Sequence, residues 1–137
     1  MKKGQIVEGI VRKIKFPNKG LVEIPGEGKW VVVKNVVTGQ KVRVSINKVR
    51  KEQAEGRLLD ILEKAPGEIA PLCPHFGACG GCTYQNLPYE QQLALKAAQV
   101  KEIMDHAVVG TYVWEGISPS PARNGYRNKM EFTFGDA

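Results

Sequence analysis

The sequence predicts a mainly β chain that carries one α-helix. Short runs of β-branched residues, each closed by a turn signal, fill residues 5–63 and favour a small barrel. A single long stretch, residues 87–107, has helical periodicity. Strict alternation returns only near the end, over residues 126–134. The expected order is therefore a five-stranded barrel, a cysteine loop, a helix, and the first strand of a truncated α+β domain.

Five strands are expected in the first part of the chain, separated by the turns PNKG, PGEG and TGQ and a short polar stretch. They are residues 5–16, 21–24, 30–37, 41–47 and 57–63. Five strands spaced about ten residues apart are typical of a closed OB-like barrel. Residues 1–65 are therefore assigned to an OB-like domain.

The stretch KVRVSIN alternates most clearly. Val42, Val44 and Ile46 share the face expected to fill the barrel, and the alternate face points outward. The outward cations and those just beyond the strand form a basic stripe suited to RNA phosphates: Lys41, Arg43, Lys48, Arg50 and Lys51. A strand edge kept soluble by lysine would look similar.

Charge is unevenly distributed along the 137 residues. Residues 1–65 carry 15 Lys and Arg against 7 Asp and Glu, whereas residues 66–137 carry 5 against 7. A basic first half favours a polyanionic partner such as RNA, although solvated surface lysines are the plain alternative. Since there is no apolar run long enough for a membrane span and no signal-peptide core, a cytoplasmic protein without a membrane partner is expected.

The segment APGEIAPL, residues 65–72, breaks both helical and strand patterns and marks a domain boundary. Residues 66–86 are assigned to the linker and cysteine loop, and 87–108 to the amphipathic helix. In that helix Pro88 suits the first turn. The apolar stripe predicted to pack comprises Leu93, Ala97, Val100, Met104 and Ala107.

Residues 109–137 are expected to begin a further domain. Residues 126–134 read as a half-buried strand, with Tyr126, Met130, Phe132 and Phe134 on one side. A lone strand cannot satisfy its backbone or cover its apolar face. The sequence is therefore expected to be a fragment that ends inside a domain.

All the cysteines of the chain lie in CPHFGACGGC: Cys73, Cys79 and Cys82. Three closely spaced thiols on a glycine-rich loop favour a [4Fe–4S] cluster with a remote fourth ligand. A zinc site with His75 as nitrogen donor is the main alternative, and three unligated thiols or a small electron carrier are weaker ones. The odd cysteine count argues against a disulfide framework and for a reduced compartment.

The basic barrel, then CPHFGACGGCTYQNLPYEQQLALKAAQV, then GYRNKMEFTFG, closely resembles the N-terminal part of a bacterial enzyme family. This family is the TRAM-domain RNA uracil-5-methyltransferases, specifically the iron–sulfur branch that modifies ribosomal RNA. The resemblance covers essentially the whole chain. It implies that residues 1–65 are the TRAM domain, that the three cysteines are cluster ligands, and that the fourth ligand lies downstream.

The resemblance further implies that residues 109–137 begin a central RNA-binding domain, with Arg127 and Lys129 as RNA contacts. The S-adenosylmethionine site and the catalytic residues would lie in a later domain, so this chain alone is expected to be inactive and the parent enzyme monomeric. The expected product is 5-methyluridine in 23S rRNA. A tRNA uracil-5-methyltransferase, or a separate RNA-binding module with structural zinc, is the alternative.

Overall fold

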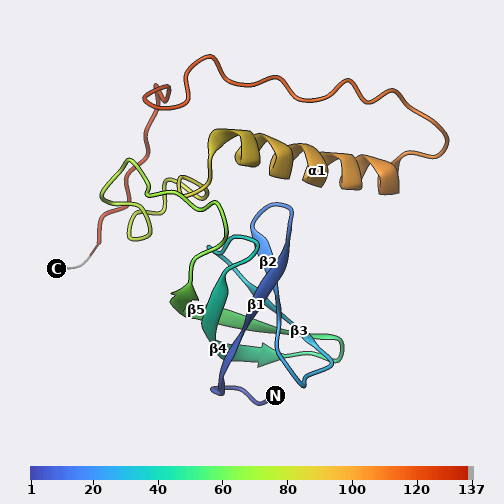
Figure 1. Ribbon diagram of the computed structural model, residues 1–137, viewed down its shortest axis with the longest axis vertical. Coiled ribbons are helices and arrows are strands. Elements are labelled where there is room, and N and C mark those ends of the chain that lie inside the picture. Colours follow the sequence, from blue (N-terminus) through green and yellow to red (C-terminus); the bar gives the residue numbers. More distant parts are fainter. Residues whose placement is uncertain (136–137) are drawn as a thin grey trace.

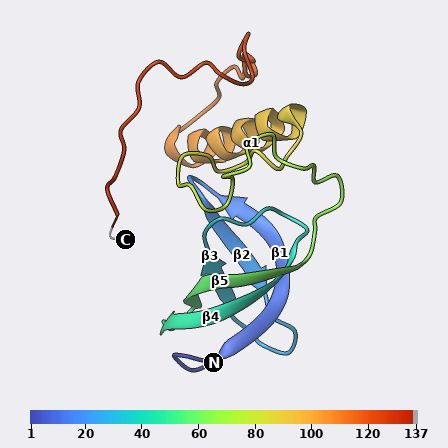
Figure 2. The same cartoon turned by 90° about the vertical axis from the view of Figure 1, so that its left-hand side faces the viewer.

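The structure is a computed structural model that describes residues 1–135. It contains the elements β1 (Ile6–Lys15), β2 (Lys19–Glu23), β3 (Trp30–Val33), β4 (Lys41–Val49), β5 (Gln53–Glu63) and α1 (Tyr89–Ala107). The five strands close into a barrel in the order β1-β2-β3-β5-β4, and α1 lies across one end of it (Figures 1 and 2). The predicted barrel and single helix are confirmed.

The barrel closes through one parallel and four antiparallel strand pairs. The parallel pair, β3 with β5, is the shortest and joins only Trp30–Gln53, Val31–Ala54 and Val32–Glu55. Beyond this seam β5 stays paired with β4 but has no strand neighbour on its β3 side. This stretch, where the closed barrel has an unpaired strand edge, is called the open side of the barrel.

Valine dominates the barrel interior because β-branched side chains fit a pleated, half-buried surface. Val42, Val44 and Ile46 are 0–1% exposed, as the alternation of KVRVSIN predicted. Gly9 on β1 allows the close approach of β2, because a Cβ atom built there would lie 2.2 Å from the carbonyl oxygen of Glu23. Alternation and one tight glycine contact thus explain the packing of β1, β2 and β4.

The predicted strand 30–37 is shorter than expected. Asn35 adopts a φ of 64°, in the left-handed region, which interrupts the strand after Val33. Val36 and Val37 are nevertheless buried in the core. The prediction that this hydrophobic run lies in the interior is therefore correct, but the prediction that it is a strand as far as residue 37 is wrong.

Helix α1 forms as predicted, but a different face contacts the barrel. Gln99 is buried and its Nε2 donates to the Ile14 carbonyl at 3.2 Å, while Glu102 pairs with Lys13 at 2.9 Å. Much of the predicted stripe is exposed, since Val100 and Met104 are 44% and 36% exposed, whereas Leu93 and Ala97 are half-buried. Leu95, one turn before Gln99, packs against the hydrophobic core, so the contacting face combines one apolar side chain with polar ones that meet the Ile14 carbonyl and the Lys13 ammonium.

The pKa values of two side chains are shifted where α1 and the segment before it contact the barrel. The Lys13 hydrogen bond to Glu102 lowers the pKa of that carboxyl, although the carboxyl stays open to solvent. Burial raises the pKa of Tyr84, whose hydroxyl donates to the Pro17 carbonyl at 3.3 Å. The segment before the helix and the helix itself are thus both attached to the β1–β2 hairpin.

Residues 126–134 form no strand in the described part of the chain, which corrects the prediction. Phe132 and Phe134 are 79% and 100% exposed, and the segment between α1 and residue 135 runs free of the sheet (Figure 1). The reason is the one expected for a lone strand: no edge among residues 1–135 pairs with it. No helix in the same range is long and apolar enough to cross a bilayer.

Candidate metal centre and nucleic-acid interface

The cysteine loop is held at both ends by one side chain. Gln85 Oε1 accepts a hydrogen bond from the Cys73 backbone N–H at 2.7 Å, and Gln85 Nε2 contacts Cys82 Sγ at 3.6 Å. Within the loop, the His75 carbonyl accepts from the backbone N–H groups of Ala78 and Cys79 at 3.2 and 2.9 Å. The loop is thus closed by polar contacts among its own residues.

The thiols provide suitable donors for iron or zinc, and none forms a disulfide. Cys79 and Cys82 are exposed and Cys73 is partly buried. Between Cys73 and Cys79, Gly77 has a φ of 94°, a backbone conformation that other residues rarely adopt, and so allows a turn there. Across residues 1–135, however, no three Cys, His, Asp or Glu side chains are grouped closely enough to hold a metal ion. The donor chemistry fits a cluster, and the ligand set remains a prediction.

Glu68 attaches this loop to the barrel. Its Oε2 accepts from the Ala65 backbone N–H at 2.9 Å and from Gln40 Nε2 at 3.3 Å, and its Oε1 accepts from Asn86 Nδ2 at 3.0 Å. Gln40 is fully buried, and its Oε1 accepts in turn from the Val37 N–H at 2.9 Å. A single carboxylate therefore connects the barrel, the linker and the segment that follows the cysteines.

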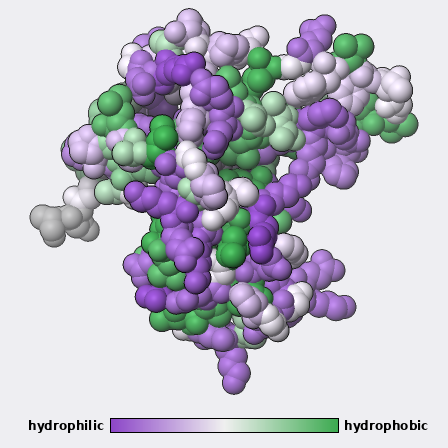
Figure 3. Space-filling model, viewed as in Figure 1, coloured by the Kyte–Doolittle hydropathy of each residue, from purple (hydrophilic) through white to green (hydrophobic). Residues whose placement is uncertain are grey.

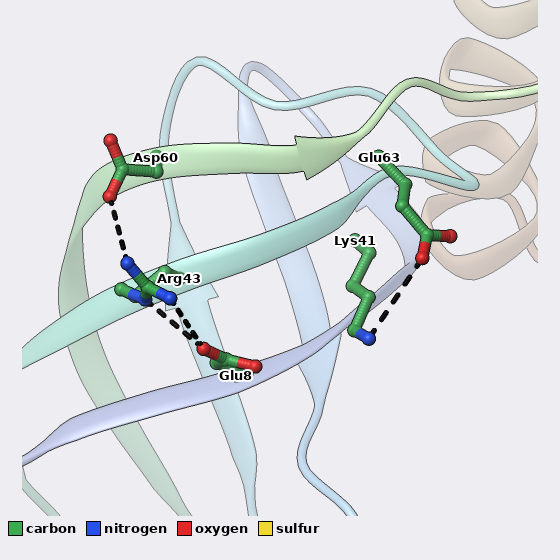
Figure 4. A network of polar contacts seen from close by, with 5 residues as sticks. All are labelled: Glu8, Lys41, Arg43, Asp60 and Glu63. Carbon is green, nitrogen blue, oxygen red and sulfur yellow. Dashed lines mark hydrogen bonds and ion pairs between the residues drawn. The ribbon is translucent and has the colours of Figure 1, made fainter.

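The basic stripe predicted on and just after β4, here called the β4 stripe, comprises Lys41, Arg43, Lys48, Arg50 and Lys51. Carboxylates of neighbouring strands neutralise its first two cations (Figure 4). Arg43 Nε and Nη2 donate to Glu8 Oε1 at 3.1 and 2.9 Å, and Nη1 donates to Asp60 Oδ2 at 3.4 Å. Lys41 lies 3.9 Å from Glu63. This part of the stripe carries two cations and three carboxylates, so it is not a basic surface.

The other cations predicted to contact RNA differ in whether a carboxylate pairs with them. Arg50 pairs with Glu55 at 2.9 Å, and Lys129 pairs with Glu131 at 3.2 Å. Lys48, Lys51 and Arg127 have no ion-pair partner within residues 1–135. Their role in RNA binding stays a prediction, with fewer free charges than the sequence suggested.

A cleft of about 960 Å³ separates the open side of the barrel from the cysteine loop. Residues on both sides line it, including Cys79 and Cys82 from the loop. Three cations on its barrel side, Lys19, Lys34 and Arg57, take part in no ion pair or side-chain hydrogen bond among residues 1–135. Sequence reasoning missed them because they lie on separate elements; only the general basicity of residues 1–65 signalled them.

On the face shown in Figure 3, hydrophilic and hydrophobic residues are interspersed. That face therefore shows no single apolar area that would mark a partner. The cysteine loop and the cleft beside it bring thiols and unpaired cations into one region of the described chain.

Comparison with known proteins places these features in context. No family model matches the chain. It is 42% identical over 135 residues to an uncharacterized RNA methyltransferase of Caldanaerobacter subterraneus, which covers 98% of this chain and 30% of that protein. A similar RNA methyltransferase of Clostridium acetobutylicum is 42% identical over 136 residues, covering 99% of this chain and 29% of that protein.

A third relative has a more specific name. The 23S rRNA (uracil(1939)-C(5))-methyltransferase RlmD of Alkalilimnicola ehrlichii is 39% identical over 102 residues, or 74% of this chain and 23% of that protein. The chain is thus similar along almost its whole length to proteins named as RNA methyltransferases, and it spans less than a third of the length of each.

Proposed function

We propose that this chain is the RNA-binding part of an S-adenosylmethionine-dependent 23S rRNA uracil-5-methyltransferase, which forms 5-methyluridine. The observation that carries the proposal is the similarity of 98% of this chain to an RNA methyltransferase, together with the similarity of 74% of it to a protein named for uracil C5 of 23S rRNA. The closed five-stranded barrel supports it, because OB-like barrels commonly bind oligonucleotides. On this proposal residues 1–65 are the TRAM domain of a monomeric cytoplasmic enzyme.

The methyl donor and the catalytic residues belong to other parts of the parent protein. S-adenosylmethionine would supply the methyl group there, and no residue of this chain is assigned to that step. The role of the chain is to grip folded RNA so that the target base can be splayed out, as enzymes acting on a base require. By itself the 137-residue chain should bind RNA and transfer no methyl group.

The cysteine loop is proposed to hold a [4Fe–4S] cluster through Cys73, Cys79 and Cys82, with a fourth ligand from elsewhere in the parent protein. Their thiols are free, and Gln85 joins the Cys73 and Cys82 ends of the loop. When bound, the cluster would fasten the loop to the rest of the enzyme. Methyl transfer to uracil involves no net redox change, so a structural role is the consistent one.

Activity is tested on the complete gene product that contains this chain. It is incubated with 23S rRNA from cells lacking the modification, tritiated S-adenosylmethionine is added, and digested nucleosides are separated. Labelled 5-methyluridine is expected from 23S rRNA and not from tRNA, and the 137-residue chain should give none. Label in tRNA alone would establish the tRNA alternative, and no label in either would refute the methyltransferase proposal.

The metal is tested by iron, sulfide and zinc determination on the same protein purified without oxygen. Iron and sulfide are expected, with absorption near 400 nm that Cys79→Ser abolishes. His75→Ala is the control and should retain the iron, since the proposal gives His75 no ligand role. Zinc that depends on both Cys79 and His75 would instead establish the zinc site.

A further inference from the structure

Three cations of the barrel that form no ion pair lie together beside the cysteine loop, whereas on the β4 stripe only Lys48 and Lys51 lack such a partner within residues 1–135. Around Arg43 the two carboxylates of Glu8 and Asp60 outweigh the guanidinium, so an approaching phosphate meets net negative charge. In the cleft, the three free cations Lys19, Lys34 and Arg57 face a single carboxylate among the lining residues, Glu55. That carboxylate is already paired with Arg50 at 2.9 Å. Uncompensated cations attract phosphates most effectively in a concave site.

Barrel closure brings these cations together. Lys19 begins β2, Lys34 follows β3, and Arg57 lies on β5 just beyond the short β3–β5 seam. Because β3 stops after Val33, Arg57 has no strand partner on that side. The three residues therefore border one opening, although 38 positions separate the first from the last.

The remaining lining suits a nucleic acid better than an acidic peptide. Phe76, partly buried on the loop side, offers a ring for base stacking. Amide side chains of Asn35 and Gln53 on the barrel side can hydrogen-bond to base edges. Because the cations lie on the barrel side and the aromatic ring on the loop side, a bound nucleotide can place its phosphate and its base against different walls.

From this arrangement we propose that the cleft between the open side of the barrel and residues 76–83 is where a single-stranded RNA segment binds. Its phosphates contact Lys19, Lys34 and Arg57, and its bases lie toward Phe76 and the cysteine loop. This inference rests on the proposal that the chain binds RNA and adds where it does so. It replaces the β4 stripe as the main contact surface.

Affinity is measured by fluorescence anisotropy with a labelled RNA hairpin whose loop contains uridines. The cleft variant is Lys19→Gln/Lys34→Gln/Arg57→Gln. The matched variant, Arg43→Gln/Lys48→Gln/Lys51→Gln, removes the same residue types from the β4 stripe. Both lower the formal net charge of +6 by three, so overall charge does not distinguish them. Circular dichroism confirms that each variant is folded.

Each phosphate contact contributes roughly 0.7 log units to the salt dependence on single-stranded nucleic acid. Three lost contacts should therefore weaken binding by up to about a hundredfold near 0.1 M salt, and lower the slope by about 2. The β4 variant should lose at least tenfold less affinity than the cleft variant. Equal losses would show binding governed by net charge, and a larger loss in the β4 variant would restore the stripe. Either result overturns the cleft proposal while leaving RNA binding intact.

The cysteines provide a second, independent measurement. Cys79 and Cys82 line the cleft, whereas Cys73 does not. In the reduced, metal-free chain, bound hairpin should slow N-ethylmaleimide labelling of Cys79 and Cys82 and leave Cys73 unchanged, as read by mass spectrometry. Labelling rates of Cys79 and Cys82 that saturating RNA does not change would refute RNA binding in the cleft. Failure of the unmodified chain to bind the hairpin at all would instead refute the proposed function.

Discussion

Glu68 offers the sharpest test of how the cysteine loop is attached to the barrel. Replacing it by alanine removes the only carboxylate that Ala65, Gln40 and Asn86 contact within residues 1–135. All three partners are buried, with exposed fractions of 6%, 0% and 7%. The substitution therefore leaves three donors without an acceptor in a region that water reaches only partly.

A buried donor left unpaired costs roughly 1–3 kcal/mol. Because Glu68 itself is partly exposed, water can reach some of the vacated space, and the lower bound applies. Three donors at about 1 kcal/mol each give about 3 kcal/mol lost from the free energy of unfolding in Glu68→Ala. Urea unfolding followed by far-ultraviolet circular dichroism measures this loss directly.

Glu68→Gln separates hydrogen bonding from simple loss of volume. Asn86 Oδ1 has no donor among residues 1–135, so a rotated Asn86 amide can accept from the new amide nitrogen. We expect this variant to lose about 1 kcal/mol or less. Glu63→Ala, at a carboxylate whose side chain is 72% exposed, is the control and should change stability by less than about 0.5 kcal/mol. A Glu68→Ala loss no larger than that of Glu63→Ala would refute the reasoning.

Two further predictions concern the barrel and its contact with α1. Gly9→Ala should lower the free energy of unfolding in urea by about 3 kcal/mol, the upper end of the usual cost of overpacking, because its Cβ would lie 2.2 Å from a backbone oxygen. Gly28→Ala, with nothing within 4 Å, should be near neutral, and equal effects would contradict the close approach. The lowered pKa of Glu102 means that its stabilising effect is complete above its ordinary value of 4.5 and fades as pH falls through the lower folded pKa. The protection of α1 amides against hydrogen exchange, taken relative to their intrinsic rate at each pH, should therefore fall in acid and fall less in Glu102→Gln. Identical acid profiles of protection would argue against the Lys13 contact.

Much of the barrel could be predicted because two-residue alternation reports directly on a sheet with one buried face. It succeeded for Val42, Val44 and Ile46, where the pattern is strict. It overestimated the strand after Val33, since nothing in the apolar run revealed that Asn35 takes a positive φ. Alternation over 126–134 was equally clear and still wrong, because a strand also needs a partner edge, which no local pattern supplies.

The prediction of which face of α1 contacts the barrel was wrong for a related reason. A helical apolar stripe predicts the packed face only where the partner surface is apolar too. The barrel end presents the Ile14 carbonyl and the Lys13 ammonium, so Gln99 and Glu102 face it. The stripe containing Val100 and Met104 is left exposed in the described chain.

The candidate RNA cleft shows the limit of sequence reasoning most clearly. The β4 stripe was conspicuous because its cations are neighbours in the sequence, yet neighbouring strands bring Glu8 and Asp60 to Arg43. Lys19, Lys34 and Arg57 were inconspicuous because they are far apart, and only closure of the barrel aligns them along one opening. Local charge density therefore overstates a surface whose counter-ions come from other strands, and it misses one that the fold itself assembles. A basic composition favours a polyanionic partner, but ion pairing across the barrel determines which cations remain free to contact one.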